Sequence, residues 1–258
     1  MSVSRFDVIR RLKQGVGRIP LVGSVAKRIY GTLRPSGPKG YYSEEVGRHL
    51  HFGVEYVYYG EVEGDVAEFG TMSGDTSVAL AQAMSFCRDL GHTPKKLHLF
   101  DSFEGLPAIT SNVDAQSQHV LSGAWGPGGC KMLGKAELLA RLQPHLAPER
   151  LVVHHGWYRD TVPKLPPSTR FGLVHVDCDL YQSTMDALEP LFANGHLAEG
   201  ALILFDDWNC NRASPAHGER RAWAELASTF SIVSSDLGGY SWDGHKFIVH
   251  SYDRKQAH

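Results

Sequence analysis

Short apolar segments alternate with helix-like stretches from Asp65 onward, and this alternation constrains the fold more than any other feature. The first five segments are residues 65–70, 96–101, 151–155, 172–177 and 201–206. They are mostly apolar on both faces, as parallel strands are when helices cover both sides of a sheet. Stripes of apolar residues near a period of 3.6 predict helices over residues 76–90, 135–146, 183–195 and 220–230. This order predicts a doubly wound α/β sheet.

Two further apolar segments, residues 230–235 and 246–250, are separated only by residues 236–245. The connection is too short for a crossover helix, so the two strands must form a hairpin with one strand antiparallel to the rest. A mostly parallel seven-stranded sheet that ends in an antiparallel hairpin resembles the Rossmann-like fold of class I methyltransferases. A plain dinucleotide-binding domain lacks the hairpin.

The chain has 258 residues and a net charge of −2, but residues 1–39 hold nine Lys or Arg and one acidic residue. We divide it into a basic N-terminal arm, residues 1–39, and an α/β domain, residues 40–258. Within that domain, the Gly-, Ser- and Pro-rich connection 107–134 is long enough to be a lid or substrate loop, or to be disordered. The nearly balanced charge favours no nucleic-acid partner.

Basic residues alternate with Ile, Leu, Val and Tyr in the basic arm. This pattern is typical of a segment that contacts an anionic membrane, although a dimerisation arm or a solvated helix face would look the same. We expect a homo-oligomer. Arg and Lys interrupt the apolar runs of the arm, which predicts neither a signal peptide nor a membrane span. The four cysteines are scattered, and we expect a cytoplasmic protein, with the inner face of the membrane as a second location.

The turn after the first predicted strand, residues 70–74, leads into a helix at Thr76. Its glycines permit a close approach to a ligand, and the first N–H groups of the helix point outward. The spacing is not GxGxxG, so the nicotinamide fingerprint is missing. Glu68 instead resembles the acid of methyltransferase motif I, which faces the methionine ammonium of S-adenosylmethionine. A merely structural turn is the alternative.

Asp101 ends the second predicted strand, where an acid can accept hydrogen bonds from two ribose hydroxyls or can simply cap the strand end. His155 ends the third strand and could lie along the adenine. The predicted cofactor-binding residues are Glu68, Gly70, Thr71, Ser73, Thr76, Asp101, Ser102, His155, Gly156 and Asp177.

Three carboxylates, Asp177, Asp206 and Asp207, follow the fourth and fifth predicted strands. The ends of parallel strands meet at one edge of the sheet, so these acids should lie close together. Their repulsion calls for a cation, and ligation by oxygen alone suits Mg²⁺. We interpret the three as metal ligands and expect Asp179, two residues past the strand, to have entered the loop. The alternative is that these acids cap the following helices.

Five blocks of the sequence carry a family resemblance. HVDCDLYQSTMDALEPL and LILFDDWN resemble the D-G-D-x-Y-x-x-T…I-I-D-D-Y pattern of the macrocin O-methyltransferase family. DVAEFGTMSGDTS, LFDSFEGLP and HGWYRDTVP resemble three further blocks in the same order, and all five span residues 65 to 210. The resemblance implies S-adenosylmethionine, Mg²⁺ held by Asp177, Asp206 and Asp207, and O-methylation of a sugar hydroxyl, often on a natural product.

A sugar hydroxyl needs acidification and a proton acceptor before it can attack at neutral pH. In the family, a histidine of the loop after the second strand serves as the base, and His119 is its positional match. The predicted catalytic residues are therefore His119 and Asp177. His155 could serve instead of His119, and a reaction driven by the metal without a protein base is a third option.

The sequence also allows other functions. A nicotinamide-dependent oxidoreductase would use the same sheet, but it fits neither the turn nor the acids. A catechol, a phenol or a lipid-linked surface glycan could replace the sugar as acceptor. A non-enzymatic scaffold domain is disfavoured by the complete set of acids.

Overall fold

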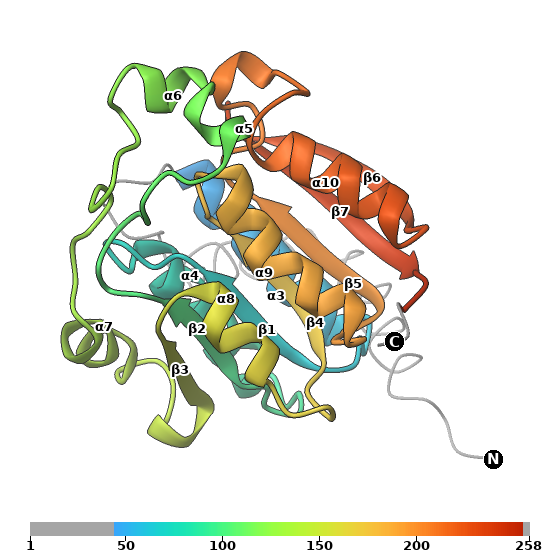
Figure 1. Cartoon of the computed structure of the whole chain (residues 1–258). Coiled ribbons are helices and arrows are strands. Elements are labelled where there is room, and N and C mark those ends of the chain that lie inside the picture. Colours follow the sequence, from blue (N-terminus) through green and yellow to red (C-terminus); the bar gives the residue numbers. More distant parts are fainter. Residues whose placement is uncertain (1–43, 255–258) are drawn as a thin grey trace, which may run out of the picture. The chain divides into compact units, whose positions relative to one another are not determined.

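A seven-stranded sheet forms the centre of residues 44–254, the part of the chain that the computed structural model describes (Figure 1). Along the sheet the strands are β3 (Leu151–His155), β2 (Leu97–Asp101), β1 (Asp65–Phe69), β4 (Phe171–Val176), β5 (Leu197–Phe205), β7 (Gly244–Ser251) and β6 (Val233–Tyr240). β1 to β5 run parallel, and β7 is antiparallel to both neighbours. The predicted fold class is confirmed. The basic arm lies outside the described residues.

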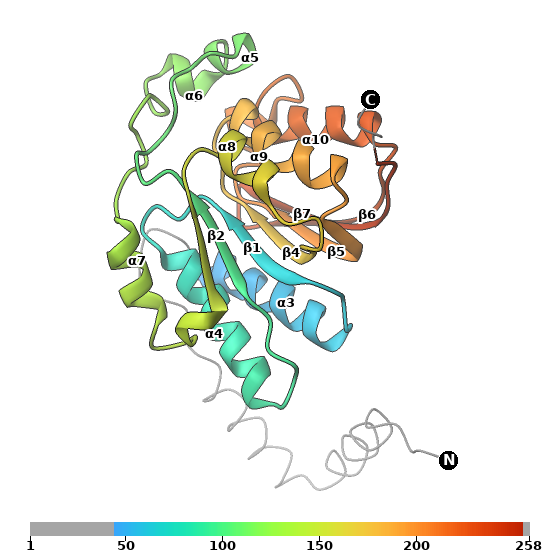
Figure 2. The ribbon, with the colours of Figure 1, turned by 60° about the horizontal axis from the view of Figure 1, so that its bottom comes forward.

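Helices cover both faces of the sheet (Figure 2). One face carries α3 (Glu44–Tyr59), α4 (Asp75–Asp89) and α7 (Lys135–Leu142), and the other carries α8 (Tyr158–Thr161), α9 (Tyr181–Ala193) and α10 (Gly218–Thr229). Side chains of each strand alternate between the two cores: Leu173 belongs to the first, Val174 to the second. Among these described helices, none is long and apolar enough to cross a membrane.

The helix α3 is not anticipated by the sequence analysis. Its buried residues Val46, Leu50, Val54 and Val57 recur at helical spacing and pack on the sheet. Gly53 lies in the same stripe, where a Cβ atom would meet Leu173 Cδ1 at 2.8 Å, so the glycine lets the helix approach the sheet closely. The same apolar stripe is visible in the sequence over residues 46–57.

The C-terminal hairpin begins later than predicted. Phe230 is fully buried after α10, and its N–H donates to Leu226 O at 2.9 Å, so the chain is still completing the helix there. β6 starts at Val233 and continues through the glycines 238 and 239, which the sequence assigns to a turn. The actual turn is residues 241–243.

The connection 107–134 contains two short helices, α5 (Asn112–Ala115) and α6 (Gln118–Leu121). Asp114 of α5 is buried, and its two oxygens accept the N–H groups of Tyr181 and Gln182 at 2.8 and 3.1 Å. These are the first N–H groups of α9, which a carboxylate stabilises well. Farther along, Leu133 donates its N–H to Met72 O at 3.1 Å. The connection is thus fastened to α9 at one end and to the β1–α4 turn at the other.

Candidate active site

A cavity opens at the edge where β1, β2, β3 and β4 end, on both sides of the point where the strand order reverses between β1 and β4. Open α/β sheets bind ligands at such a point. Of the predicted site residues, those that line the cavity are Gly70, Thr71, Ser73, Thr76, Asp101, Ser102, Gly156, Asp177 and Asp206. Asp179, which we expected in the loop, lines the cavity as well, together with Trp157 and Cys130.

The β1–α4 turn is pressed against the end of β4. Gly70 has a φ of 90°, and a Cβ atom there would collide with the carbonyl oxygen of Asp177. The Asp177 N–H donates to Phe69 O at 2.9 Å, which continues the strand pairing to this point. Only glycine allows the turn and the first carboxylate to lie in contact.

The carboxylate of Asp101 faces the same turn. Its Oδ2 accepts hydrogen bonds from Thr71 N at 2.8 Å and from Thr71 Oγ1 at 2.7 Å, and its Oδ1 accepts one from Phe103 N at 2.6 Å. Asp101 is therefore oriented by the protein itself at the cavity wall. A carboxylate can accept about four hydrogen bonds, which leaves capacity for a ribose hydroxyl.

Glu68 lies elsewhere than we expected. Its side chain is fully buried, and it accepts hydrogen bonds from Ser77 Oγ and from Nδ1 of His175, the latter at 3.2 Å. Glu68 does not line the cavity. The reason is strand alternation: Glu68 follows Val66 onto the face covered by α3 and α4, below the turn.

His155 also departs from its predicted place beside the adenine. It is exposed, and its ring meets that of Phe103 edge-on with centroids 5.2 Å apart. It does not line the cavity, because β3 is the edge strand and the side chain turns outward. The neighbouring Gly156 and Trp157 line the wall in its stead.

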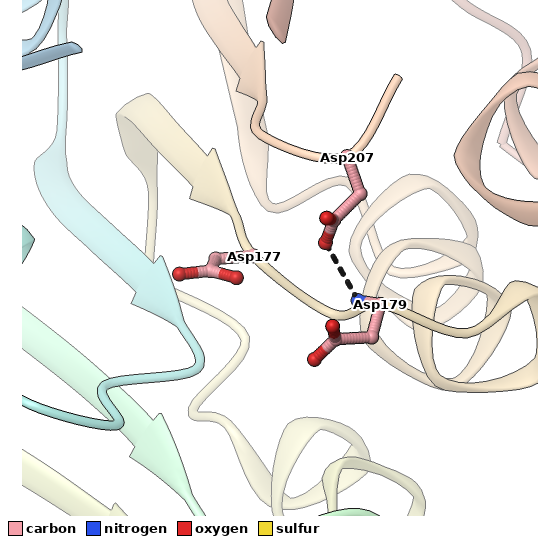
Figure 3. Close-up of side chains that lie close together, drawn as sticks. All are labelled: Asp177, Asp179 and Asp207. Carbon is pink, nitrogen blue, oxygen red and sulfur yellow. Dashed lines mark hydrogen bonds between the residues drawn. The ribbon is translucent and has the colours of Figure 1, made fainter. Parts of the chain in front are cut away.

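Three half-buried carboxylates gather where β4 and β5 end (Figure 3). One oxygen each of Asp177, Asp179 and Asp207 lies within 4.8 Å of the others, and Asp179 N donates to Asp207 Oδ2 at 3.1 Å. Burial, followed by the charges of Asp206 and Asp207, raises the pKa of Asp177 well above its usual range. Burial and Asp206 likewise raise the pKa of Asp179 to about 7.

Asp206, which we predicted as a third ligand beside Asp177 and Asp207, borders this cluster and lines the cavity. Its Oδ1 points instead toward His175, 3.9 Å from Nε2. Asp179 lies closer to Asp177 and Asp207 than we expected. Its left-handed φ of 60° turns the backbone back toward the end of β4. The spacing D-x-D was the available signal for Asp179.

The donor set of this cluster fits a hard divalent cation. Its ligand atoms are carboxylate oxygens, which are the ligands that Mg²⁺ prefers. Like charges at this separation repel strongly in a half-buried site, and a cation between them would remove that cost.

His119 lies on α6 and does not line the cavity. Its ring stacks on Trp125 with centroids 4.4 Å apart, and its Nδ1 lies 2.9 Å from Oδ1 and 3.1 Å from N of Asn211. Asn211 is buried and follows Asp207 by four residues. The connection 107–134 is thereby tied to the same segment that carries the carboxylates.

Residues 24–234 match the family model described as macrocin O-methyltransferase (TylF). The chain belongs to the macrocin O-methyltransferase family. It is therefore an O-methyltransferase, as the sequence blocks indicated. The match also begins earlier than residue 65, where those blocks start, and so includes part of the basic arm.

Two relatives of this O-methyltransferase come from Streptomyces. The 8-demethyl-8-(2,3-dimethoxy-alpha-L-rhamnosyl)-tetracenomycin-C 4'-O-methyltransferase of Streptomyces olivaceus is 29% identical over 75% of this chain and 71% of its own. Demethyldecarbamoylnovobiocin O-methyltransferase of Streptomyces niveus is 25% identical over 73% and 69%.

Two solved structures share the fold of this family member. The O-methyltransferase NovP has a TM-score of 0.64 at 20% identity and covers 87% of this chain and 88% of its own. The calicheamicin methyltransferase CalS11 has the same TM-score at 21% identity, with coverages of 96% and 94%. Their likeness supports the architecture of the sheet.

Proposed function

We propose that this O-methyltransferase transfers the methyl group of S-adenosylmethionine to a hydroxyl of a sugar or glycosylated natural product, with the help of Mg²⁺. The observation that carries the proposal is the contact between two halves of the site. We call them the cofactor half, which is the β1–α4 turn with Asp101, and the carboxylate half, which is the acidic cluster after β4 and β5. The β1–α4 turn and Asp101 form a pocket wall, and Asp177 lies directly against that turn. A donor in the first half and a hydroxyl at the carboxylates would be neighbours.

The cofactor half supplies binding and orientation. Asp101, held by Thr71, would accept a hydrogen bond from the ribose. The N-terminal end of α4 beyond Gly74 offers N–H groups, and Trp157 offers an aromatic wall for the adenine. Glu68 lies beneath the turn, where it pairs with His175 and does not reach the cavity.

The carboxylate half would hold the metal through Asp177, Asp207 and either Asp179 or Asp206. When bound, a divalent cation there supplies Lewis-acid acidification of an acceptor hydroxyl. The chain's own contribution is to fix that hydroxyl in line with the methyl–sulfur bond and to exclude water, which accounts for much of the rate in such reactions.

His119 is the proposed proton acceptor. The backbone N–H of Asn211 donates to His119 Nδ1 at 3.1 Å, which puts the proton of the neutral ring on Nε2, so His119 would act as the base only once this contact is broken. Because His119 stands outside the cavity wall, the connection 107–134 must move inward when the acceptor binds. A reaction without a protein base is the alternative, and it requires no such movement.

The sugar acceptor rests on the relatives. The names of the two Streptomyces enzymes describe a rhamnosyl tetracenomycin and a novobiocin precursor. A catechol, a phenol or a lipid-linked surface glycan is the second candidate for the acceptor.

The test is a methylation assay with S-adenosylmethionine and a panel of glycosides and catechols, read by mass spectrometry with MgCl₂ or with EDTA. We expect a methylated glycoside only with MgCl₂. Undiminished product in EDTA would refute the metal requirement, and methylation of catechols alone would refute the sugar acceptor.

A further inference from the structure

A buried histidine spans the two halves of the site from below. His175 of β4 is fully buried; its Nδ1 lies 3.2 Å from Glu68 Oε1, and its Nε2 lies 3.9 Å from Asp206 Oδ1. The imidazole thus stands between a carboxylate on β1 and a carboxylate at the end of β5.

The sheet itself imposes this position. Glu68 is the direct register partner of His175 across β1 and β4, and Leu204 is its partner on β5. Side chains of register partners point to the same face, and Asp206, two residues past Leu204, shares that orientation. A polar row therefore runs across three adjacent strands, below the cavity and on the face that α3 and α4 cover.

The row has one contact that is not completed within the protein. Nε2 of His175 and Oδ1 of Asp206 are both buried, and neither has another hydrogen-bond partner among the described residues. Their separation of 3.9 Å exceeds a hydrogen bond but is within ion-pair range. A small rotation of the Asp206 side chain would join them.

We propose that His175 is a positioning residue: anchored on Glu68 through Nδ1, it directs Nε2 at Asp206 and thereby orients that carboxylate for metal binding. The inference rests on the proposed metal dependence. The Asp206 side chain is 21% exposed although its Oδ1 is buried, so Oδ2 is the oxygen left to reach the cavity. Residues that hold a ligand in this way typically change metal affinity about 10- to 100-fold when replaced.

Two substitutions separate the contact of His175 Nδ1 from that of Nε2. In His175→Asn, the amide replaces Nδ1 and keeps the bond to Glu68, while the contact with Asp206 is lost. In His175→Gln, the longer side chain replaces Nε2 and can still donate to Asp206. The two variants therefore cost the core comparable packing but differ in which carboxylate they hold.

The measurement is the dissociation constant of Mn²⁺, a paramagnetic probe for an oxygen-ligand site, by electron paramagnetic resonance on the full-length protein. Binding of S-adenosylmethionine by calorimetry and the thermal midpoint are recorded for each protein. We expect His175→Asn to weaken Mn²⁺ binding about 10-fold or more, His175→Gln to stay close to the wild type, and the cofactor affinity of His175→Asn to be unchanged.

Equal Mn²⁺ affinity in all three proteins, or an equal loss in both variants, would overturn the positioning role and leave His175 as a packing residue. A wild type that binds S-adenosylmethionine but not Mn²⁺ would overturn the proposed metal dependence and this inference with it. A wild type that binds both, with variants that do not differ, overturns the inference alone.

Discussion

The two halves of the site treat their carboxylates differently. In the cofactor half, Asp101 accepts three hydrogen bonds from the backbone and side chains of its neighbours, and Asp75 pairs with Arg141 at 2.6 Å. In the carboxylate half, Asp177 and Asp207 face other acids, and burial together with those charges raises the pKa of both well above the usual range.

The protein's own atoms complete the cofactor half, and the carboxylate half is the one for which we propose an external positive charge. The cofactor wall should keep its shape in a chelator, because its carboxylates are hydrogen-bonded or ion-paired within the protein. The carboxylate half should respond to cations in both affinity and stability, since each raised pKa reports an unfavourable ionised form.

The largest effect should come from breaking the carboxylate half alone. Asp207→Asn removes one charge of the cluster, and we expect turnover to fall by about 100-fold or more because cation binding is impaired. Calorimetry should show unchanged S-adenosylmethionine affinity, with Asp253→Asn, a surface change far along the chain, as the control. A parallel loss of cofactor binding would mean that the halves are not independent.

A substitution in the cofactor half should have a smaller effect, and it should weaken cofactor binding while leaving cation binding intact. Asp101→Ala removes the proposed acceptor for ribose and the carboxylate that accepts from Thr71. Loss of charged hydrogen bonds should raise the dissociation constant of S-adenosylmethionine about 10- to 100-fold. Mn²⁺ binding should be retained, and an unaltered cofactor affinity would show that Asp101 is only a capping residue.

The connection 107–134, which is tied to α9 and to the β1–α4 turn, offers a third test. Asp114→Ala removes the carboxylate that accepts the first N–H groups of α9, which should lower the free energy of unfolding by about 1–2 kcal/mol. Urea denaturation measures this cost, and limited proteolysis within residues 107–134 should become faster than in the wild type. Asp114→Asn keeps an acceptor and is the matched control. If proteolysis is unchanged, Asp114 does not fasten the loop.

The last test concerns the sheet beneath the cofactor half, and its effect is confined to acid pH. Burial, followed by His98, lowers the pKa of His154 to about 4, so the folded state disfavours the proton. Stability from this group is fully present above pH 6.5 and is lost as the pH falls from 6.5 toward 4. His154→Gln should therefore show a shallower loss of stability in urea titrations across that window. An identical pH dependence would contradict the assignment.

The sequence predicts the sheet well because each buried strand is written as an apolar run, and an acid after such a run must lie at the carboxyl edge. Asp101, Asp177 and Asp206 could be placed in this way. The orientation of side chains near strand ends could not, because it depends on local backbone geometry. Asp179 returns through a left-handed φ, and Glu68 turns inward to a histidine 107 residues away.

His175 is another residue whose surroundings could not be predicted from the sequence. The chain has 14 histidines, and the sequence shows only that His175 lies in an apolar run. The strand register is what sets it beside Glu68 and below Asp206. By contrast, α3 was recoverable from spacing alone.

The missing side chain of Gly70 has a consequence for the geometry of transfer. The Asp177 carbonyl occupies the space that a Cβ atom would take, so the β1–α4 turn and Asp177 can lie in contact only while residue 70 has no side chain. An alanine there would wedge the two strands apart, and a misplacement of about 1 Å is enough to cost such reactions about 100-fold. Residue 70 therefore limits how closely the β1–α4 turn and Asp177 can approach each other, although it contributes no side chain to the reaction.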